Sequence, residues 1–247
     1  MRTSKEFHWK TWRKSCPKNK SEFKRFVGCD SLWNRTRLFI KRDNEVAIVT
    51  VQTTLDFYNK NAAAFIEGTL NVDFKSIQDT FLEYVPKGSK ILDFGCGSGR
   101  DTKYFLEQGY DVDAVDGSVE LCKAASAYTG ILVKQMLFHE LDAENMYDGI
   151  WACASILHVK RDELPVILRK MSKALKETGW MYFSFKYGDF EGERNGRYFT
   201  DMTEEGMDVL LQGFPELHVE KQWITGDVRA GRESEQWLNL ILRKCTF

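Results

Sequence analysis

The sequence predicts an α/β protein with a doubly wound, mostly parallel sheet of seven strands, preceded by a basic N-terminal extension. From residue 54 onward, helical and strand-like patterns alternate, as they do where helices cross between parallel strands. A glycine-rich turn joins the first buried strand to a helix, as in open sheets that bind ligands. The 247 residues are 43% hydrophobic and 29% charged, with only 4 prolines, which excludes disordered and collagen-like chains.

The elements follow from this alternation in chain order. Two helices are expected at residues 54–67 and 73–84, before a buried strand at 90–94 and a helix at 100–107. Further strands are expected at residues 111–116, 131–135, 148–153, 179–186, 217–224 and 237–243. The remaining helices are expected at residues 119–127, 161–175 and 203–211, the last with Thr203 as its N-cap.

Charge divides the chain into two predicted parts. Residues 1–42 hold 13 Lys and Arg against three acidic residues, whereas the whole chain has a net charge of -1. We therefore expect a basic, aromatic-rich extension at residues 1–52, with a hairpin or edge strand near 37–51, and a body at 53–247. The extension fits three roles: a packing segment, a lid or homodimer contact, or a nucleic-acid contact that is not favoured.

Composition also limits the partners of the protein. No apolar run approaches the roughly 20 residues of a membrane span, so we expect a cytoplasmic protein without membrane contact. The six cysteines show no C-x-x-C spacing, which predicts neither a disulfide framework nor a metal site.

The glycine-rich turn carries the strongest functional signal. Gly95, Gly97 and Gly99 alternate directly after the first strand, so the third glycine comes one residue too early for the dinucleotide pattern G-x-G-x-x-G. Asp116 ends the next strand, where a carboxylate can accept both hydroxyls of a ribose. The pair of features favours an adenosine-containing ligand.

These residues resemble a known family. Asp93-x-Gly95-x-Gly97-x-Gly99 followed by Asp116 is similar to the first two motifs of class I S-adenosylmethionine-dependent methyltransferases, and the resemblance covers about residues 54–247. Residues 147–159, 185–188 and 197–202 further resemble bacterial small-molecule methyltransferases grouped with the tellurite-resistance enzymes. The resemblance implies a Rossmann-like fold, S-adenosylmethionine as cofactor and S-adenosylhomocysteine as product.

The resemblance also implies a set of cofactor contacts. Asp93 would brace the turn and meet the amino group of the cofactor, Arg100 would pair with its carboxylate, and Tyr58 would cover the same end. Many relatives carry an acidic residue for adenine where this chain has Leu137 and Phe138, so adenine would meet apolar side chains and a backbone amide, or Glu140 or Asp142 instead. The full predicted set is Tyr58, Asp93, Gly95, Gly97, Gly99, Arg100, Asp116, Leu137, Phe138 and Cys153.

On the acceptor side, methyl transfer is an in-line displacement that needs positioning, exclusion of water and, where the acceptor loses a proton, a base. His158 is the candidate base, with a structural histidine as the equal alternative, and Tyr187 is a candidate orienting group. Lys186, Arg194, Arg197 and Tyr198 form the predicted substrate site, because clustered arginines suit an anion, unless they pair with neighbouring acids.

The predicted function is methyl transfer to a small, anionic acceptor. Two alternatives stay open: an RNA or tRNA methyltransferase that uses the basic extension, and a protein that binds the cofactor as an interaction partner without turnover.

Overall fold

A computed structural model describes residues 51–229, 231–232 and 234–245 of the chain, which belong to one compact unit. Apart from its last residue, the hairpin expected near 37–51 lies outside the described residues, as does nearly all of the basic extension. No helix in the described ranges is both long and apolar enough to cross a lipid bilayer.

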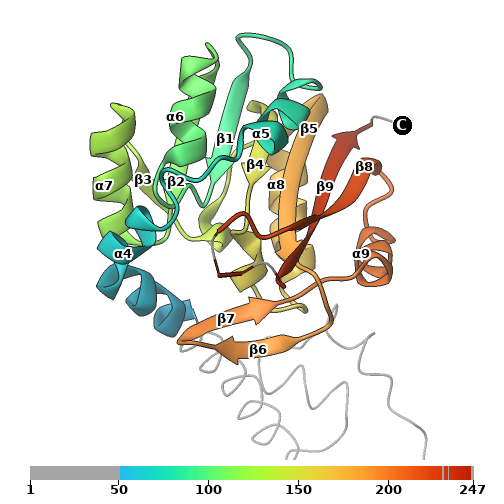
Figure 1. The fold of residues 1–247 in the computed structure, drawn as a ribbon. Helices are drawn as coiled ribbons and strands as arrows, with labels where there is room; N and C mark the ends of the chain where they lie inside the picture. The colour runs from blue at the N-terminus through green and yellow to red at the C-terminus, as the bar shows by residue number, and fades with distance from the viewer. Residues whose placement is uncertain (1–50, 230, 233, 246–247) are drawn as a thin grey trace, which may run out of the picture. The chain divides into compact units, whose positions relative to one another are not determined.

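The predicted seven-stranded sheet is confirmed (Figure 1). Its order is β3-β2-β1-β4-β5-β9-β8, and β9 runs antiparallel to both of its neighbours, while the other strand pairs are parallel. The strands are β1 (Lys90–Phe94), β2 (Asp111–Asp116), β3 (Lys134–Gln135), β4 (Tyr147–Ala152), β5 (Leu175–Lys186), β8 (Leu217–Gly226) and β9 (Gln236–Lys244). Successive strands are added on one side of β1 as far as β3, and on its other side from β4 onward. Open sheets of this kind bind ligands at this switch point between β1 and β4.

Helices cover both faces of the sheet (Figure 1). The labelled helices are α4 (Ala62–Glu67), α5 (Lys75–Leu82), α6 (Arg100–Glu107), α7 (Val119–Thr129), α8 (Leu164–Ala174) and α9 (Glu204–Leu211), with short 3-10 turns η2 (Phe138–Glu140) and η3 (Ile156–His158). The Thr203 side chain accepts a hydrogen bond from Gly206 N, so the predicted N-cap of α9 is confirmed.

The core has two parts because side chains alternate along the strands. Leu92 and Ile150 point into a cluster with residues of α8 and α9. Ile91 and Trp151, one position away, point into a second cluster that α5 and α6 cover on the opposite face. The Trp151 ring stacks on Tyr182 of the neighbouring strand with centroids 4.0 Å apart.

Several boundaries differ from the prediction. The first helix is already formed at residues 51–60 and is interrupted at Asn61 before α4 begins. The helix expected at 161–175 begins only at Leu164, with Pro165 in its first turn, where a missing N–H costs nothing. Leu175 opens β5, which begins four residues earlier than expected, and β3 is only two residues long.

The segment between β5 and α9, for which the sequence predicts neither a strand nor a helix, contains a second, two-stranded sheet. Strands β6 (Glu191–Arg194) and β7 (Arg197–Thr200) pair antiparallel around Asn195 and Gly196, whose φ angles are 51 and 74°. An Asn-Gly pair is the strongest local signal for such a turn. Figure 1 shows this hairpin beyond the carboxyl ends of the sheet strands.

Candidate active site

A cavity of about 600 Å³ lies at the carboxyl ends of β1, β2, β4 and β5. Most of the residues predicted for the site line it together: Tyr58, Gly95, Gly97, Arg100, Asp116, Leu137, Phe138, Cys153, His158, Lys186, Arg194 and Arg197. Four predicted residues are not among its lining residues: Asp93, Gly99, Tyr187 and Tyr198. The cavity therefore gathers residues from separate strand ends, while these four lie apart from it.

The glycine-rich turn needs its glycines for space as well as for backbone conformation. Gly95 has a φ of 92°, and a Cβ there would lie 2.5 Å from Cβ of Ser155. A Cβ on Gly97 would lie 3.0 Å from the ring of Phe65. Gly99 instead faces α7, where a Cβ would approach Thr129 to 2.9 Å. Two of the three glycines thus border the cavity, and the third packs a helix.

Asp116 holds the turn and borders the cavity at the end of β2. One carboxylate oxygen accepts from Gly97 N at 2.9 Å and the other from Ser118 N at 2.8 Å. Burial raises its pKa, and these backbone donors act against that rise. Since each oxygen has two lone pairs, one on each remains for hydroxyl donors from a ligand.

Asp93 lies behind the turn and is only 2% exposed. Its Oδ2 accepts from the hydroxyl of Thr102 at 2.5 Å. Burial, with the nearby carboxylate of Asp101, raises the pKa of Asp93 to about 8. Its structural role is to link β1 to α6.

Arg100 is already engaged within the protein. Its guanidinium makes two hydrogen bonds to Asp101, at 2.7 and 3.0 Å, and lies 4.2 Å from the ring centroid of Phe74. Asp101 also accepts from Gln78 and from the Trp151 indole. A carboxylate bound to Arg100 would therefore share the guanidinium with Asp101.

On the predicted adenine side, Leu137 and Phe138 line the cavity, and Phe138 packs edge-on against Phe94 with centroids 4.9 Å apart. The Glu140 carboxylate accepts from Leu137 N at 2.7 Å, which caps η2. Glu140 and the Leu137 amide are thus paired with each other.

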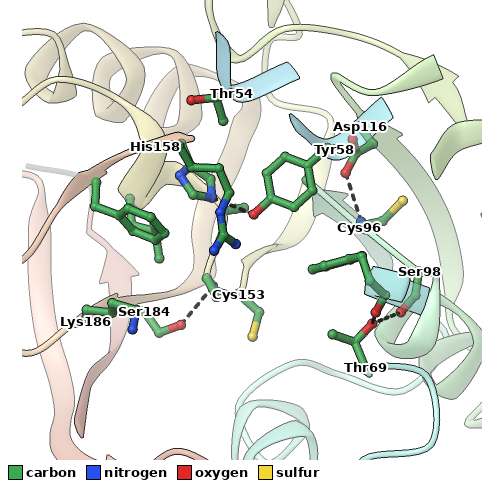
Figure 2. A pocket seen from close by; sticks show the side chains of 18 of the residues that line it. Thr54, Tyr58, Thr69, Cys96, Ser98, Asp116, Cys153, His158, Ser184 and Lys186 are labelled. Carbon is green, nitrogen blue, oxygen red and sulfur yellow. Dashed lines mark hydrogen bonds between the residues drawn. The ribbon is translucent and has the colours of Figure 1, made fainter. Parts of the chain in front are cut away.

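His158 has hydrogen-bond partners at both ring nitrogens. Nδ1 lies 2.6 Å from the backbone oxygen of Tyr198, and Nε2 lies 2.8 Å from the hydroxyl of Tyr58. Because a carbonyl oxygen only accepts, Nδ1 carries the proton and Nε2 accepts from Tyr58. Burial lowers the pKa of His158 to about 4, so the ring is neutral near pH 7. Figure 2 shows Tyr58 between His158 and Asp116.

The opposite wall of the cavity carries cations. Lys186 pairs with Glu235, Arg194 with Asp201, and Arg229 with Asp227. Arg197 forms no ion pair with the described residues, and its buried Nε has no hydrogen-bond partner. Its guanidinium lies 4.4 Å from the ring centroid of Phe57 and 5.1 Å from that of Phe199.

Other predicted residues have different surroundings. The Tyr187 ring is 37% exposed outside the cavity, next to the carboxylate of Glu204. The Tyr198 hydroxyl donates to Glu191, and only the backbone oxygen of Tyr198 contacts His158.

Cys153 lines the cavity as a neutral thiol, because burial raises its pKa to about 12. No group of His, Cys, Asp and Glu in the described ranges could hold a metal ion.

The sequence prediction missed the aromatic residues that surround Arg197. Phe57, Phe65 and Phe199 all contact groups at the cavity. Alternation along β7 places Phe199 on the same face as Arg197, and an Asn-Gly hairpin prediction would have indicated this.

Residues 69–221 match the family model described as a methyltransferase domain, which is more than half of the chain. The chain belongs to this methyltransferase family. It is an S-adenosylmethionine-dependent enzyme, as the motif resemblance implied.

The methyltransferase is similar to several known proteins. An uncharacterized methyltransferase of Staphylococcus carnosus is 23% identical over 61% of this chain and 80% of its own length. A probable S-adenosyl-L-methionine-dependent methyltransferase TehB of Haemophilus influenzae is 27% identical, over 37% of this chain and only 34% of its own length. The 1,6-didemethyltoxoflavin-N1-methyltransferase of Burkholderia thailandensis, solved with S-adenosylhomocysteine, shares the fold with a TM-score of 0.64, at 23% identity, over 83% of this chain and 90% of its own.

The cavity of the methyltransferase suits its cofactor. The turn presents backbone rather than side chains at Gly95 and Gly97, and each Asp116 oxygen keeps a lone pair for a further hydrogen-bond donor. The volume lies within the range of small-ligand pockets, which is roughly 300–1,000 Å³.

Proposed function

We propose that this methyltransferase moves the methyl group of S-adenosylmethionine to a small, anionic acceptor. The observation that carries the proposal is that one cavity joins the turn and Asp116 to a wall with Lys186, Arg194 and Arg197. Cations in a partly enclosed cavity favour an anion, and a guanidinium binds carboxylates through paired hydrogen bonds.

The residues divide the work between two halves of the cavity. Bound S-adenosylmethionine supplies the electrophilic methyl group at a sulfonium. Asp116 accepts hydrogen bonds from the ribose, while Leu137 and Phe138 contact the adenine. The cationic wall holds the acceptor, and the rings of Tyr58 and Phe199 exclude water from the space between acceptor and cofactor.

Two measurements test the proposal. Calorimetry should show S-adenosylhomocysteine binding to the full chain. Mass spectrometry of a metabolite extract incubated with methyl-labelled cofactor should show labelled products whose precursors are anions. A parallel incubation with total RNA that takes up label while the metabolites do not would favour the RNA alternative, and labelled products from neutral or cationic precursors alone would contradict the anionic acceptor.

A further inference from the structure

Four residues that line the cavity form a corner with a positive charge and no available base. We call it the Arg197 corner: Tyr58, His158, Arg197 and Phe199, with Phe57 packed against the Arg197 guanidinium. If the protein transfers a methyl group as proposed, an acceptor that loses a proton must either give that proton to a base in the cavity or bind without it.

His158 does not offer a free lone pair in this corner. Its Nδ1–H donates to the Tyr198 carbonyl, and its Nε2 accepts from the Tyr58 hydroxyl. Burial lowers its pKa to about 4; the hydrogen bond to the Tyr198 backbone opposes this fall, and the charge of Arg197 adds a smaller lowering, because a second positive charge beside the guanidinium is unfavourable. A proton placed on His158 would thus be held weakly.

Tyr58 does not act as a base either. Burial raises the pKa of its hydroxyl, and the nearby guanidinium of Arg197 only opposes this rise. The hydroxyl therefore stays protonated and donates a hydrogen bond to Nε2 of His158. Its remaining lone pairs accept hydrogen bonds but cannot hold a further proton near neutral pH.

The other titratable groups at the cavity are already committed. Asp116 accepts from two backbone amides, and Cys153 is a neutral thiol. The carboxylates of Asp101, Asp227 and Glu235 pair with Arg100, Arg229 and Lys186. His139 follows Phe138 on the adenine side and lies 3.5 Å from Glu163.

Arg197 contrasts with the other cations of the cavity. Arg100, Lys186, Arg194, Arg229 and Arg232 each have a carboxylate partner among the described residues. Arg197 instead lies beside the Tyr58 hydroxyl, with which it interacts, and beside three rings whose centroids are 4.4, 5.1 and 5.7 Å from its Cζ; its buried Nε lacks a hydrogen-bond partner. A buried polar atom without a protein partner is available to a bound ligand or a water molecule.

We infer that the acceptor binds with its nucleophile already deprotonated, that Arg197 holds this negative charge, and that no side chain removes a proton during transfer. The acceptors are therefore acidic nucleophiles such as thiols, acidic phenols, ring N–H or enol groups, and carboxylic acids, rather than alcohols or ammonium ions. The acceptor proton is lost to solvent before binding. The lone pair of the acceptor then forms the new bond to the methyl carbon while the carbon–sulfur bond breaks, and its electron pair stays on sulfur. The negative and sulfonium charges cancel, so the step balances without a base.

The test uses 4-nitrophenol as the probe, because its neutral and anionic forms absorb at different wavelengths. The full chain is first saturated with S-adenosylhomocysteine, with binding followed by calorimetry, and the bound probe is then titrated with acid. We expect the pKa of the bound probe to fall by about one unit relative to the free probe, as expected beside one opposite charge. Arg197→Met should abolish this fall, and Arg197→Lys should restore part of it.

The matched control is Arg243→Met, which removes the same charge from an exposed position on β9, beside Trp180 in the middle of β5 and six residues along that strand from Lys186. It should leave the probe titration unchanged. A probe that binds as the neutral phenol, that does not bind to the saturated protein, or that titrates in Arg197→Met as in wild type would overturn the inference. If S-adenosylhomocysteine itself does not bind, the proposed function fails, and the inference fails with it.

Discussion

The Tyr58 hydroxyl lies 2.8 Å from Nε2 of His158, so a residue of the first described helix occupies the nitrogen that a catalytic base would need. The sequence separation of the pair is 100 residues. The helix of Tyr58 is further tied to the body where Tyr198 N donates to the Thr54 hydroxyl, and where the Ser118 hydroxyl donates to Asn59. His158 thus holds the Tyr58 side chain in place at the cavity, which is the structural alternative that the sequence left open for this histidine.

A double-mutant cycle should detect this hydrogen bond. We expect Tyr58→Phe and His158→Ala to show a coupling of about 1 kcal/mol in the free energy of unfolding, because each substitution removes the same bond. Urea titrations of the wild type, both single variants and the double variant give this value. Tyr110→Phe, whose hydroxyl donates to Val85 elsewhere, should add to His158→Ala without coupling. Equal coupling in both cycles would show that the bond is not the cause.

The neutral state of His158 makes stability depend on pH. Its pKa is about 4 in the folded protein, below the ordinary value of 6.5, so the unfolded chain binds more protons between these values. Stability is complete above the ordinary pKa and falls as the pH drops through this window. We expect a loss on the order of 3 kcal/mol that His158→Gln removes, measured by urea unfolding across the range. Wild type and variant losing equal stability over the window would rule out His158 as the source.

Asp93 should act in the opposite direction. Its folded pKa of about 8 lies above the ordinary 3.8, so the folded protein binds the extra proton, and stability falls as the pH rises through this window. Asp93→Asn keeps an acceptor for Thr102 and cannot ionise. As the pH increases, the free energy of unfolding should therefore fall in wild type but not in the variant. A difference between the two proteins that stays constant with pH would contradict the raised pKa of Asp93.

Local pattern was enough to predict the elements that contain the turn. β1, α6 and β2 have the bounds that the sequence predicted, because the glycine-rich turn marks the end of β1 and the start of α6, and charged residues stand at both ends of β2. Asp116 and Gly97 could be placed at the cavity for the same reason. The boundary between α8 and β5 could not, because Leu175 fits either element and only pairing with Tyr147 decides it.

Pairing among the charged side chains could not be predicted from the sequence. Arg194 and Arg197 lie three residues apart in the same hairpin, yet only Arg194 has a carboxylate partner, Asp201. From the sequence, either arginine could form an ion pair or bind substrate. The tertiary structure places Asp201 against Arg194, so Arg194 is the one that forms the ion pair. Likewise, the sequence places His158 after β4, but it does not show that the Tyr58 hydroxyl donates a hydrogen bond to its Nε2.

Asp116 should be necessary for cofactor affinity. Asp116→Ala removes an acceptor for the ribose and also frees Gly97 N, so we expect a loss of about 1–3 kcal/mol in the binding of S-adenosylhomocysteine. Isothermal calorimetry measures this loss. Asp111→Ala, an exposed position at the other end of β2, is the matched control and should bind normally. Unchanged affinity in Asp116→Ala would remove this residue from the cofactor site.

Gly95 should tolerate no side chain, for two separable reasons. Its φ of 92° strains any other residue, and an added Cβ would also lie 2.5 Å from Ser155. Gly88 offers a matched comparison, because its φ of 75° imposes similar strain while nothing lies within 4 Å of an added Cβ. We expect Gly95→Ala to lower the free energy of unfolding by about 1–3 kcal/mol more than Gly88→Ala, since it alone adds overpacking. Urea titrations measure both losses, and equal losses would show that Ser155 yields to the added methyl group. The position would then require glycine only for its backbone conformation.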